Sequence, residues 1–363
     1  MQFDKPPRPA TLFGGRPLPA GHTAAGHHAS ANDDDLEPPP PLTDYFDSVS
    51  DVAVAGSDAT FRVYQTRAAD SESTSAGPLF VFHHGAGHTA LSWALLAGLL
   101  RQRIQKCSVL AYDCRGHGGT VTADDADLSL ERLAQDLGNV VNTLYPTPPA
   151  DVILVGHSMG GAVVTHVAAT APGTLLKKPL LGVVVIDVVE GTAMDSLAHM
   201  QVYLRNRPDS FPSVRKAVEW STTTTIKNEA SARISVPSQL KPVPNAENPT
   251  KWVWRTNLMP SQVHWKGWFK GLSKKFLTSR AARLLILAGT DRLDTELTIG
   301  QMQGKYQLAL YPESGHAIQE DEPGRLAETL CEFWDRNGPG KVIKRFPIPI
   351  KSVAAAPATA PPS

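Results

Sequence analysis

A serine flanked by glycines is the residue of this chain best suited to do chemistry. Residues 156–160 have the form G-x-S-x-G with Ser158 at the centre, between the apolar run 152–155 and the small, apolar residues 161–164. A strand, a sharp turn and a helix in this order form a nucleophile elbow, whose glycines let the backbone turn without clashes. The pattern therefore predicts that Ser158 is the nucleophile of a serine hydrolase.

A serine nucleophile also needs hydrogen-bond donors for the oxyanion that forms on its substrate. The apolar run 79–82 predicts a buried strand that leads into the glycine-containing loop 83–88, where α/β hydrolases carry an oxyanion loop. We expect the oxyanion hole to consist of the backbone N–H groups of Ala86, in this loop, and of Met159. His84, in the same loop, is a candidate for contact with the substrate.

The general base of such an enzyme is expected after the last strand of the sheet. Residues 306–310 predict a short strand, and the loop 312–317 follows it with His316. Of the twelve histidines in the chain, His316 combines the expected chain order with a loop position. The sequence therefore predicts His316 as the base that takes the proton from Ser158.

Two carboxylates compete for the position that orients this base. Asp291 follows the apolar strand predicted at 284–288, the usual position in this fold, and Asp187 ends the β-branched run 182–186. Either carboxylate could orient the imidazole and stabilise its protonated form. Spacing alone favours Asp291.

Further segments resemble those of the protein phosphatase methylesterases, which demethylate the C-terminal leucine of type 2A protein phosphatase catalytic subunits. The resemblance covers most of residues 78–336. Segments 84–93 and 156–161 are generic to hydrolases, whereas nothing in a hydrolase fold alone demands the remaining matches. These specific matches are the segments 186–195, 265–273, 291–294 and 299–305.

The resemblance implies an α/β-hydrolase fold, with a mostly parallel central sheet flanked by helices. It implies that Asp187 is the triad acid, with Asp291 as the alternative, and that the partner is the methylated C-terminus of the type 2A phosphatase catalytic subunit. We expect no metal and no organic cofactor, because backbone dipoles and the imidazole handle the developing charge. A small-ester or lipid hydrolase, and a phosphatase-binding scaffold with a vestigial hydrolase, are the alternatives.

Composition sets limits on compartment and partners. The 363 residues include 35 basic and 35 acidic side chains, which gives no global electrostatic argument for binding nucleic acid or a membrane. The odd count of 3 cysteines, without paired spacing, favours reduced thiols. Neither a bilayer-spanning apolar run nor a leader pattern is present, so we expect the protein in the cytoplasm or nucleus. We also expect it to be a monomer.

The chain divides into three parts by composition. Residues 1–40 and 339–363 are rich in residues that cannot form a core and are predicted to be disordered tails. Residues 41–338 alternate strand and helix patterns and predict one catalytic domain. A helical cap is predicted at about 192–280, which holds five of the seven tryptophans of the chain, and Trp268 is our first candidate for an exposed contact with the substrate.

Overall fold

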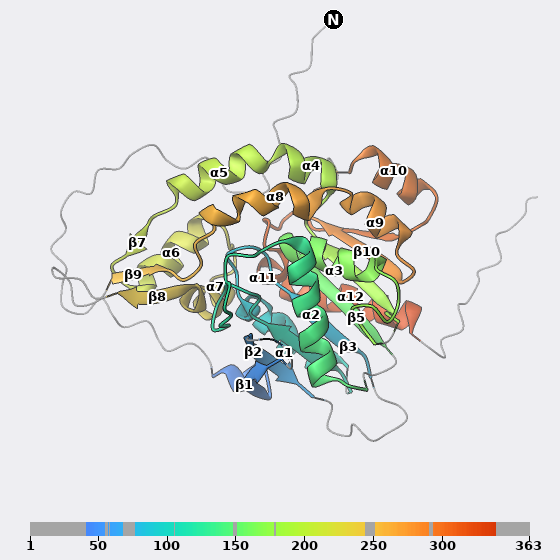
Figure 1. Ribbon diagram of the computed structural model, residues 1–363, viewed down its shortest axis with the longest axis horizontal. Coiled ribbons are helices and arrows are strands. Elements are labelled where there is room, and N and C mark those ends of the chain that lie inside the picture. Colours follow the sequence, from blue (N-terminus) through green and yellow to red (C-terminus); the bar gives the residue numbers. More distant parts are fainter. Residues whose placement is uncertain are drawn as a thin grey trace, which may run out of the picture.

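The structure of this chain is a computed structural model that describes most of the predicted catalytic domain. The described residues are 41–54, 57, 59–67, 77–104, 106–147, 151–177, 179–243, 251–289 and 293–338. Both predicted tails, 1–40 and 339–363, lie outside them. Figure 1 shows a central sheet, helices packed around it, and a cap that lies along the top and left of the view.

The main sheet has the strand order β1-β2-β4-β3-β5-β6-β10-β11 in the described residues. Strand β2 is antiparallel to β1 and β4, and the remaining neighbours are parallel. The predicted mostly parallel α/β-hydrolase sheet is therefore confirmed. Its strands are β1 (Ser48–Ala53), β2 (Thr60–Thr66), β3 (Leu79–His83), β4 (Ser108–Tyr112), β5 (Val152–His157), β6 (Gly182–Ile186), β10 (Ala282–Leu287) and β11 (Gln307–Leu310).

Alternation of side chains along the central strands creates a hydrophobic core on each face of the sheet. In β5, Leu154 belongs to one core and Val155 to the other, and both are fully buried. Helices α2 (Leu130–Leu144) and α3 (Met159–Ala169) cover the first face, and α1 (Ala94–Arg103) and α12 (Pro323–Asn337) cover the second. Each such large apolar side chain contributes roughly 1.5–3 kcal/mol by burial.

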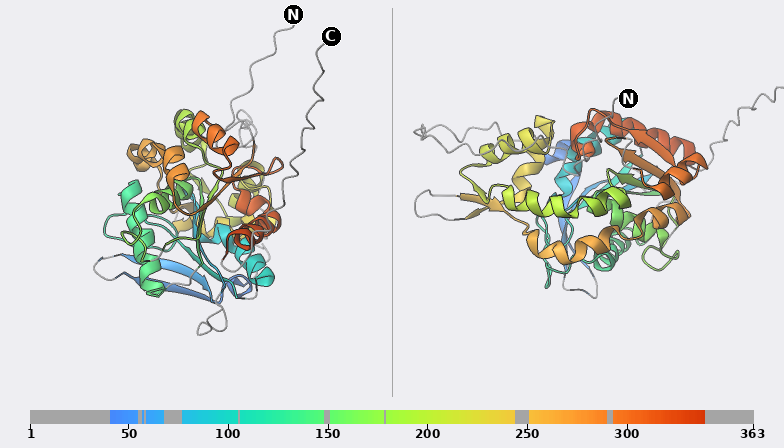
Figure 2. Two further views of the ribbon diagram at one scale, coloured as in Figure 1. Left: turned by 90° about the vertical axis from the view of Figure 1, so that its right-hand side faces the viewer. Right: turned by 90° about the horizontal axis from the view of Figure 1, so that it is seen from above.

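The cap inserted between β6 and β10 contains strands as well as helices. Most of its elements are helices, as predicted, and its strands have only two to four residues, too few for a period to be visible in the sequence. The views in Figure 2 show the same helices and strands from the side and from above. The cap elements are α4 (Glu190–Asp195), α5 (Leu197–Asn206), β7 (Ser210–Phe211), α6 (Val214–Thr224), α7 (Glu229–Ser235), β8 (Leu240–Val243), β9 (Lys251–Trp254), α8 (Gln262–Phe269) and α9 (Leu272–Thr278).

Two further helices border the catalytic edge of the sheet, α10 (Thr295–Met302) after β10 and the short α11 (Ile318–Asp321) before α12. The carboxyl ends of β3, β5, β6 and β10 meet at this edge because these strands are parallel. The cap is inserted at the same edge, after β6. None of the described helices is long and apolar enough to cross a membrane.

A buried ion pair fixes the long loop that follows β4. The Arg115 guanidinium donates to both carboxylate oxygens of Asp136 on α2, at 2.9 and 3.1 Å, and their side chains are 3% and 1% exposed. Arg115 also donates to the Asp124 carbonyl at 2.7 Å. These bonds attach the loop to α2, and the same loop supports the catalytic edge through His117.

We predict that Asp136→Ala lowers the free energy of unfolding by about 3–5 kcal/mol, because it leaves the Arg115 charge buried without its carboxylate. The control is Glu219→Ala, which removes a carboxylate that is 47% exposed and paired on the surface of α6. That change should cost less than about 1 kcal/mol. Urea denaturation followed by tryptophan fluorescence measures both values. Equal losses of unfolding free energy would contradict a stabilising role for the buried Arg115–Asp136 pair.

Candidate active site

Ser158 lies at a tight turn between β5 and α3, where two glycines allow close backbone contacts. Its φ of 52° is left-handed, uncommon for a residue with a side chain, and its N–H donates to the Ile186 carbonyl at 3.0 Å. A Cβ on Gly156 would lie 2.2 Å from the Gly160 oxygen, and a Cβ on Gly160 would lie 2.2 Å from the His83 oxygen. Both glycines of the predicted elbow are therefore sterically required.

The carboxylate of Asp187 contacts the predicted base. Asp187 follows β6 with a φ of 51°, and its Oδ2 accepts a hydrogen bond from His316 Nδ1 at 2.8 Å. Its Oδ1 accepts from the Ala288 N–H at 3.0 Å, and the Asp187 and His316 side chains are 0% and 8% exposed. The competing acid, Asp291, lies outside the described residues. The geometry thus supports Asp187, the residue implied by resemblance, although spacing favoured its competitor.

A second histidine packs against this base. The His157 and His316 ring centroids are 4.6 Å apart, and His157 Nε2 lies 2.9 Å from the His316 carbonyl oxygen. Burial, followed by the proximity of His316, lowers the pKa of His157 well below its usual value. His157 is therefore neutral, with its proton on Nε2 donated to that carbonyl, and it adds no charge beside the base.

The predicted oxyanion donors come from two segments that approach Ser158. Met159 is the first residue of α3, so its N–H has no partner within the helix and lies at the positive end of the helix dipole. Ala86 lines the same pocket as His316. A Cβ on Gly85, the residue before it, would lie 3.3 Å from Ser158 Cβ, which shows how closely the loop approaches the nucleophile.

A hydrogen bond to His117 fixes the loop 83–88. His117 Nε2 accepts the Gly87 N–H at 2.9 Å, and His117 Nδ1 lies 2.8 Å from the Arg115 carbonyl oxygen. Burial lowers the pKa of His117 to about 4, so near neutral pH the ring is uncharged, donates through Nδ1 and accepts through Nε2. This support could not be predicted from the sequence, because it becomes visible only when the fold places the loops after β3 and β4 together.

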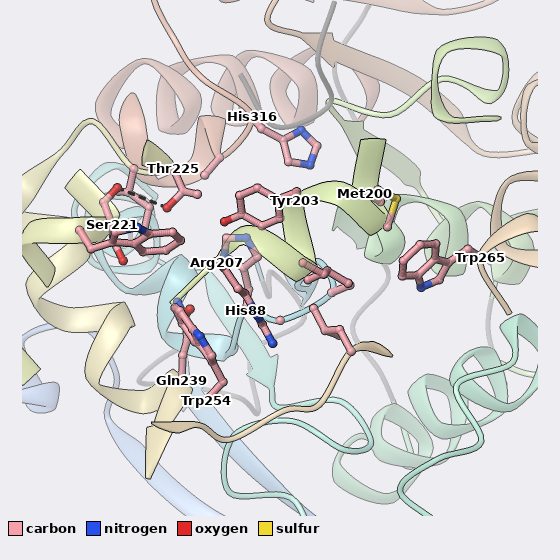
Figure 3. A pocket seen from close by; sticks show the side chains of 17 residues that line it. His88, Met200, Tyr203, Arg207, Ser221, Thr225, Gln239, Trp254, Trp265 and His316 are labelled. Atoms are coloured by element: carbon pink, nitrogen blue, oxygen red, sulfur yellow. Dashed lines mark hydrogen bonds between the residues drawn. The ribbon is translucent and has the colours of Figure 1, made fainter. Parts of the chain in front are cut away.

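A pocket opens between the cap and the catalytic edge and encloses a cavity of about 70 Å³. Figure 3 shows His316 at one side of this pocket, with side chains of α5, α6 and β9 around it. Its walls are largely aromatic and apolar. The cap contributes Met200, Tyr203, Leu204, Arg207, Trp220 and Trp254.

The two predicted substrate contacts, His84 and Trp268, are not at the surface of this pocket. His84 is fully buried, its Nε2 accepts the Cys114 N–H at 3.0 Å, and its Nδ1 lies 2.8 Å from the Gly85 oxygen. Trp268 is 1% exposed and donates its indole N–H to the Leu128 carbonyl at 2.6 Å. The prediction of an exposed Trp268 is wrong, because its large apolar surface packs the cap against the loop before α2.

A buried carboxylate beside the pocket was not singled out from the sequence. Glu320 on α11 is 0% exposed, and its Oε2 accepts hydrogen bonds from Ser231 and Ser235 of α7 at 3.0 and 2.6 Å. Its Oε1 lies 3.3 Å from Nδ1 of His88, which lines the pocket. The signal in the sequence is weak, since it consists only of a glutamate four residues after His316. Within the described residues, no cluster of three or more His, Cys, Asp or Glu side chains is arranged to hold a metal ion.

We predict that Asp187→Asn lowers kcat of ester hydrolysis by about 10³–10⁴-fold, because an amide cannot hold the His316 tautomer that accepts the serine proton. Asp291→Asn is the comparison, and we expect it to leave kcat within about threefold of the parent. Steady-state kinetics with an activated ester, at matched folded concentration, separates the two acids. The reverse ranking would assign the role to Asp291.

Comparisons with known proteins agree with this fold. The family model for the alpha/beta hydrolase family matches residues 80–329. Among solved structures, the fold is similar to that of E-2-(acetamidomethylene)succinate hydrolase, with a TM-score of 0.63 and 17% identity over 79% of this chain and 100% of that one. It is also similar to an esterase from Mycobacterium tuberculosis, with a TM-score of 0.56 and 21% identity over 79% of this chain and 92% of that one.

Curated relatives are much closer in sequence. Protein phosphatase methylesterase 1 of Gibberella zeae is 46% identical over 306 residues, which cover 82% of this chain and 74% of that protein. The Emericella nidulans protein of the same name is 49% identical over 283 residues, with 73% and 69% covered, and the Homo sapiens protein is 41% identical over 341 residues, with 82% and 85% covered. These relatives are 41–49% identical over most of the chain, and the chain therefore belongs to the protein phosphatase methylesterase family of α/β hydrolases.

Proposed function

We propose that this protein is a serine carboxylesterase that removes the methyl ester from the C-terminal leucine of the type 2A protein phosphatase catalytic subunit. The observation that carries the proposal is the hydrogen bond between Asp187 and His316 beside the strained Ser158 turn. The substrate is supported by the names of the relatives and by the resemblance of the segments 186–195, 265–273, 291–294 and 299–305.

In the first half of the proposed reaction, His316 Nε2 accepts the Ser158 hydroxyl proton as Oγ attacks the ester carbonyl. The N–H groups of Ala86 and Met159 donate to the oxyanion, and the negative Asp187 stabilises the imidazolium that forms. Collapse of the tetrahedral intermediate breaks the bond to the methoxy oxygen. His316 returns its proton to that oxygen, and methanol leaves.

In the second half, water repeats these steps on the acyl-enzyme. His316 takes a proton from the attacking water, the same N–H groups hold the second oxyanion, and Ser158 leaves with the proton. The products are a free C-terminal carboxylate and the regenerated enzyme. In both halves of the reaction, backbone N–H groups stabilise the oxyanion and Asp187 stabilises the protonated His316.

We place this activity in the cytoplasm or nucleus. The placement is supported by the unpaired state of Cys107, Cys114 and Cys331, since proteins of oxidising compartments usually pair such residues. Fractionation of cells that carry the tagged protein tests this placement.

We predict that Ser158→Ala and His316→Ala each lower demethylation of the methylated phosphatase catalytic subunit by at least about 10³-fold, because the residues act as a unit. The control is Ser50→Ala, an exposed residue of the edge strand β1, which should retain parent activity. Loss of the methyl group is measured by mass spectrometry of the phosphatase C-terminus. Parent-like turnover in either site variant would exclude the serine mechanism.

The same assay with an activated small ester separates the substrate proposal from the mechanism. If the parent protein hydrolyses the small ester but leaves the phosphatase methylated, the chain is a small-ester hydrolase of the same fold. If it hydrolyses neither and still binds the phosphatase, it is a scaffold.

A further inference from the structure

One cation, Arg207, lies in the wall of the pocket without an acidic partner among the described residues. Arg207 follows α5, and its guanidinium Cζ lies 4.8 Å above the centre of the Trp254 ring. Its single hydrogen bond to a described residue is a long one of 3.5 Å to the Thr256 carbonyl. Arg207 lines the same cavity as His316, and Figure 3 shows it beside Tyr203 and Trp254.

The charge of this arginine is poorly compensated. No carboxylate of the described residues lies within 4.0 Å of it, and the nearby Asp209, which is exposed, acts on it only at longer range. Burial lowers the pKa of Arg207, which indicates that the surrounding wall removes water from the guanidinium. A guanidinium carries five N–H donors, and most of those of Arg207 have no acceptor among the described residues.

The rest of the fold shows how this chain compensates an arginine that is buried for structural reasons. Arg115 donates to both oxygens of Asp136 and to two further oxygens, so its donors are used within the protein. Arg207 has no such arrangement. Arg207 is partly buried, and a ligand that supplies the missing acceptor would offset the cost of desolvating its charge.

We propose that Arg207 is a specificity-determining residue, which binds the carboxylate side chain of an Asp or Glu upstream of the esterified residue in the substrate. A carboxylate is the acceptor that matches the planar fork of a guanidinium with two parallel hydrogen bonds. Trp254 holds the guanidinium plane by stacking, which leaves the edge of the fork for the ligand. This inference rests on the proposed function, since it takes the pocket to accept the C-terminal segment of a polypeptide.

The test uses synthetic hexapeptide α-methyl esters in which one Asp is placed two, three or four residues before the esterified leucine, each paired with its Asn version. We expect one Asp position to raise kcat/KM about 10–100-fold over Asn, the range for a charge-assisted hydrogen bond. Arg207→Gln should remove that preference, so that kcat/KM falls about 10–100-fold more on the preferred Asp peptide than on its Asn version or on a small activated ester. Arg207→Lys should keep only part of it, because a point charge replaces the fork.

Arg205→Gln is the matched control, since Arg205 is an exposed arginine in the last turn of α5, just before Arg207, and it should keep the full preference. A parent enzyme with no Asp preference at any position, or an Arg207→Gln variant that loses activity equally on Asp and Asn peptides, would overturn the proposal. The second result would assign Arg207 to general positioning or to the product carboxylate.

Binding measured in the Ser158→Ala background separates this inference from the proposed function. Fluorescence anisotropy with labelled Asp and Asn peptides gives the dissociation constants without turnover. If the parent cleaves no peptide ester but the Ser158→Ala protein prefers the Asp peptide through Arg207, the proposed function fails and the Arg207 site stands. If peptides are cleaved with no preference in rate or binding, the Arg207 site fails and the proposed function stands.

Discussion

The catalytic edge depends on the parallel pairing of β5 and β6, which holds two strained residues side by side. Ser158 and Asp187 have φ values of 52° and 51°, and the residues before them, His157 and Ile186, are register partners. Conformations of this kind cost on the order of 1–3 kcal/mol each and persist only where the surroundings impose them. Here the surroundings are strands buried on both faces, so the packing of the whole sheet maintains the geometry of the nucleophile and of the carboxylate that faces the base.

Residues from three of the segments that carry the family resemblance form one hydrogen-bonded network. The Glu190 carboxylate accepts the N–H groups of Gly271 and Ser273 at 2.8 and 3.2 Å. The Ser273 hydroxyl donates to Asp294, whose carboxylate also accepts the Leu297 N–H at the start of α10. These bonds join the cap to the start of α10, which gives Glu190, Ser273 and Asp294 a structural role.

Elements that are marked by a continuous run of residues could be predicted from the sequence. Contacts between loops far apart in the chain could not. The predicted strands 79–82, 152–155 and 182–186 lie within one or two residues of β3, β5 and β6, because buried parallel strands are continuous apolar runs. The acid could not be chosen by spacing, since only the fold brings Asp187 to His316 across 129 residues. An aromatic residue such as Trp268 looks the same in sequence whether it packs a cap or meets a partner.

Glu320 joins the cap to the segments around the base. It is fully enclosed, and its hydrogen bonds connect cap helix α7, the loop that carries His88, and the helix that follows the His316 loop. A fully buried carboxylate needs all of these donors together, because solvent cannot replace any of them. The cap is therefore not an interchangeable module, because a graft from another hydrolase would have to supply matching hydroxyls on its own helix to preserve the loop of the base.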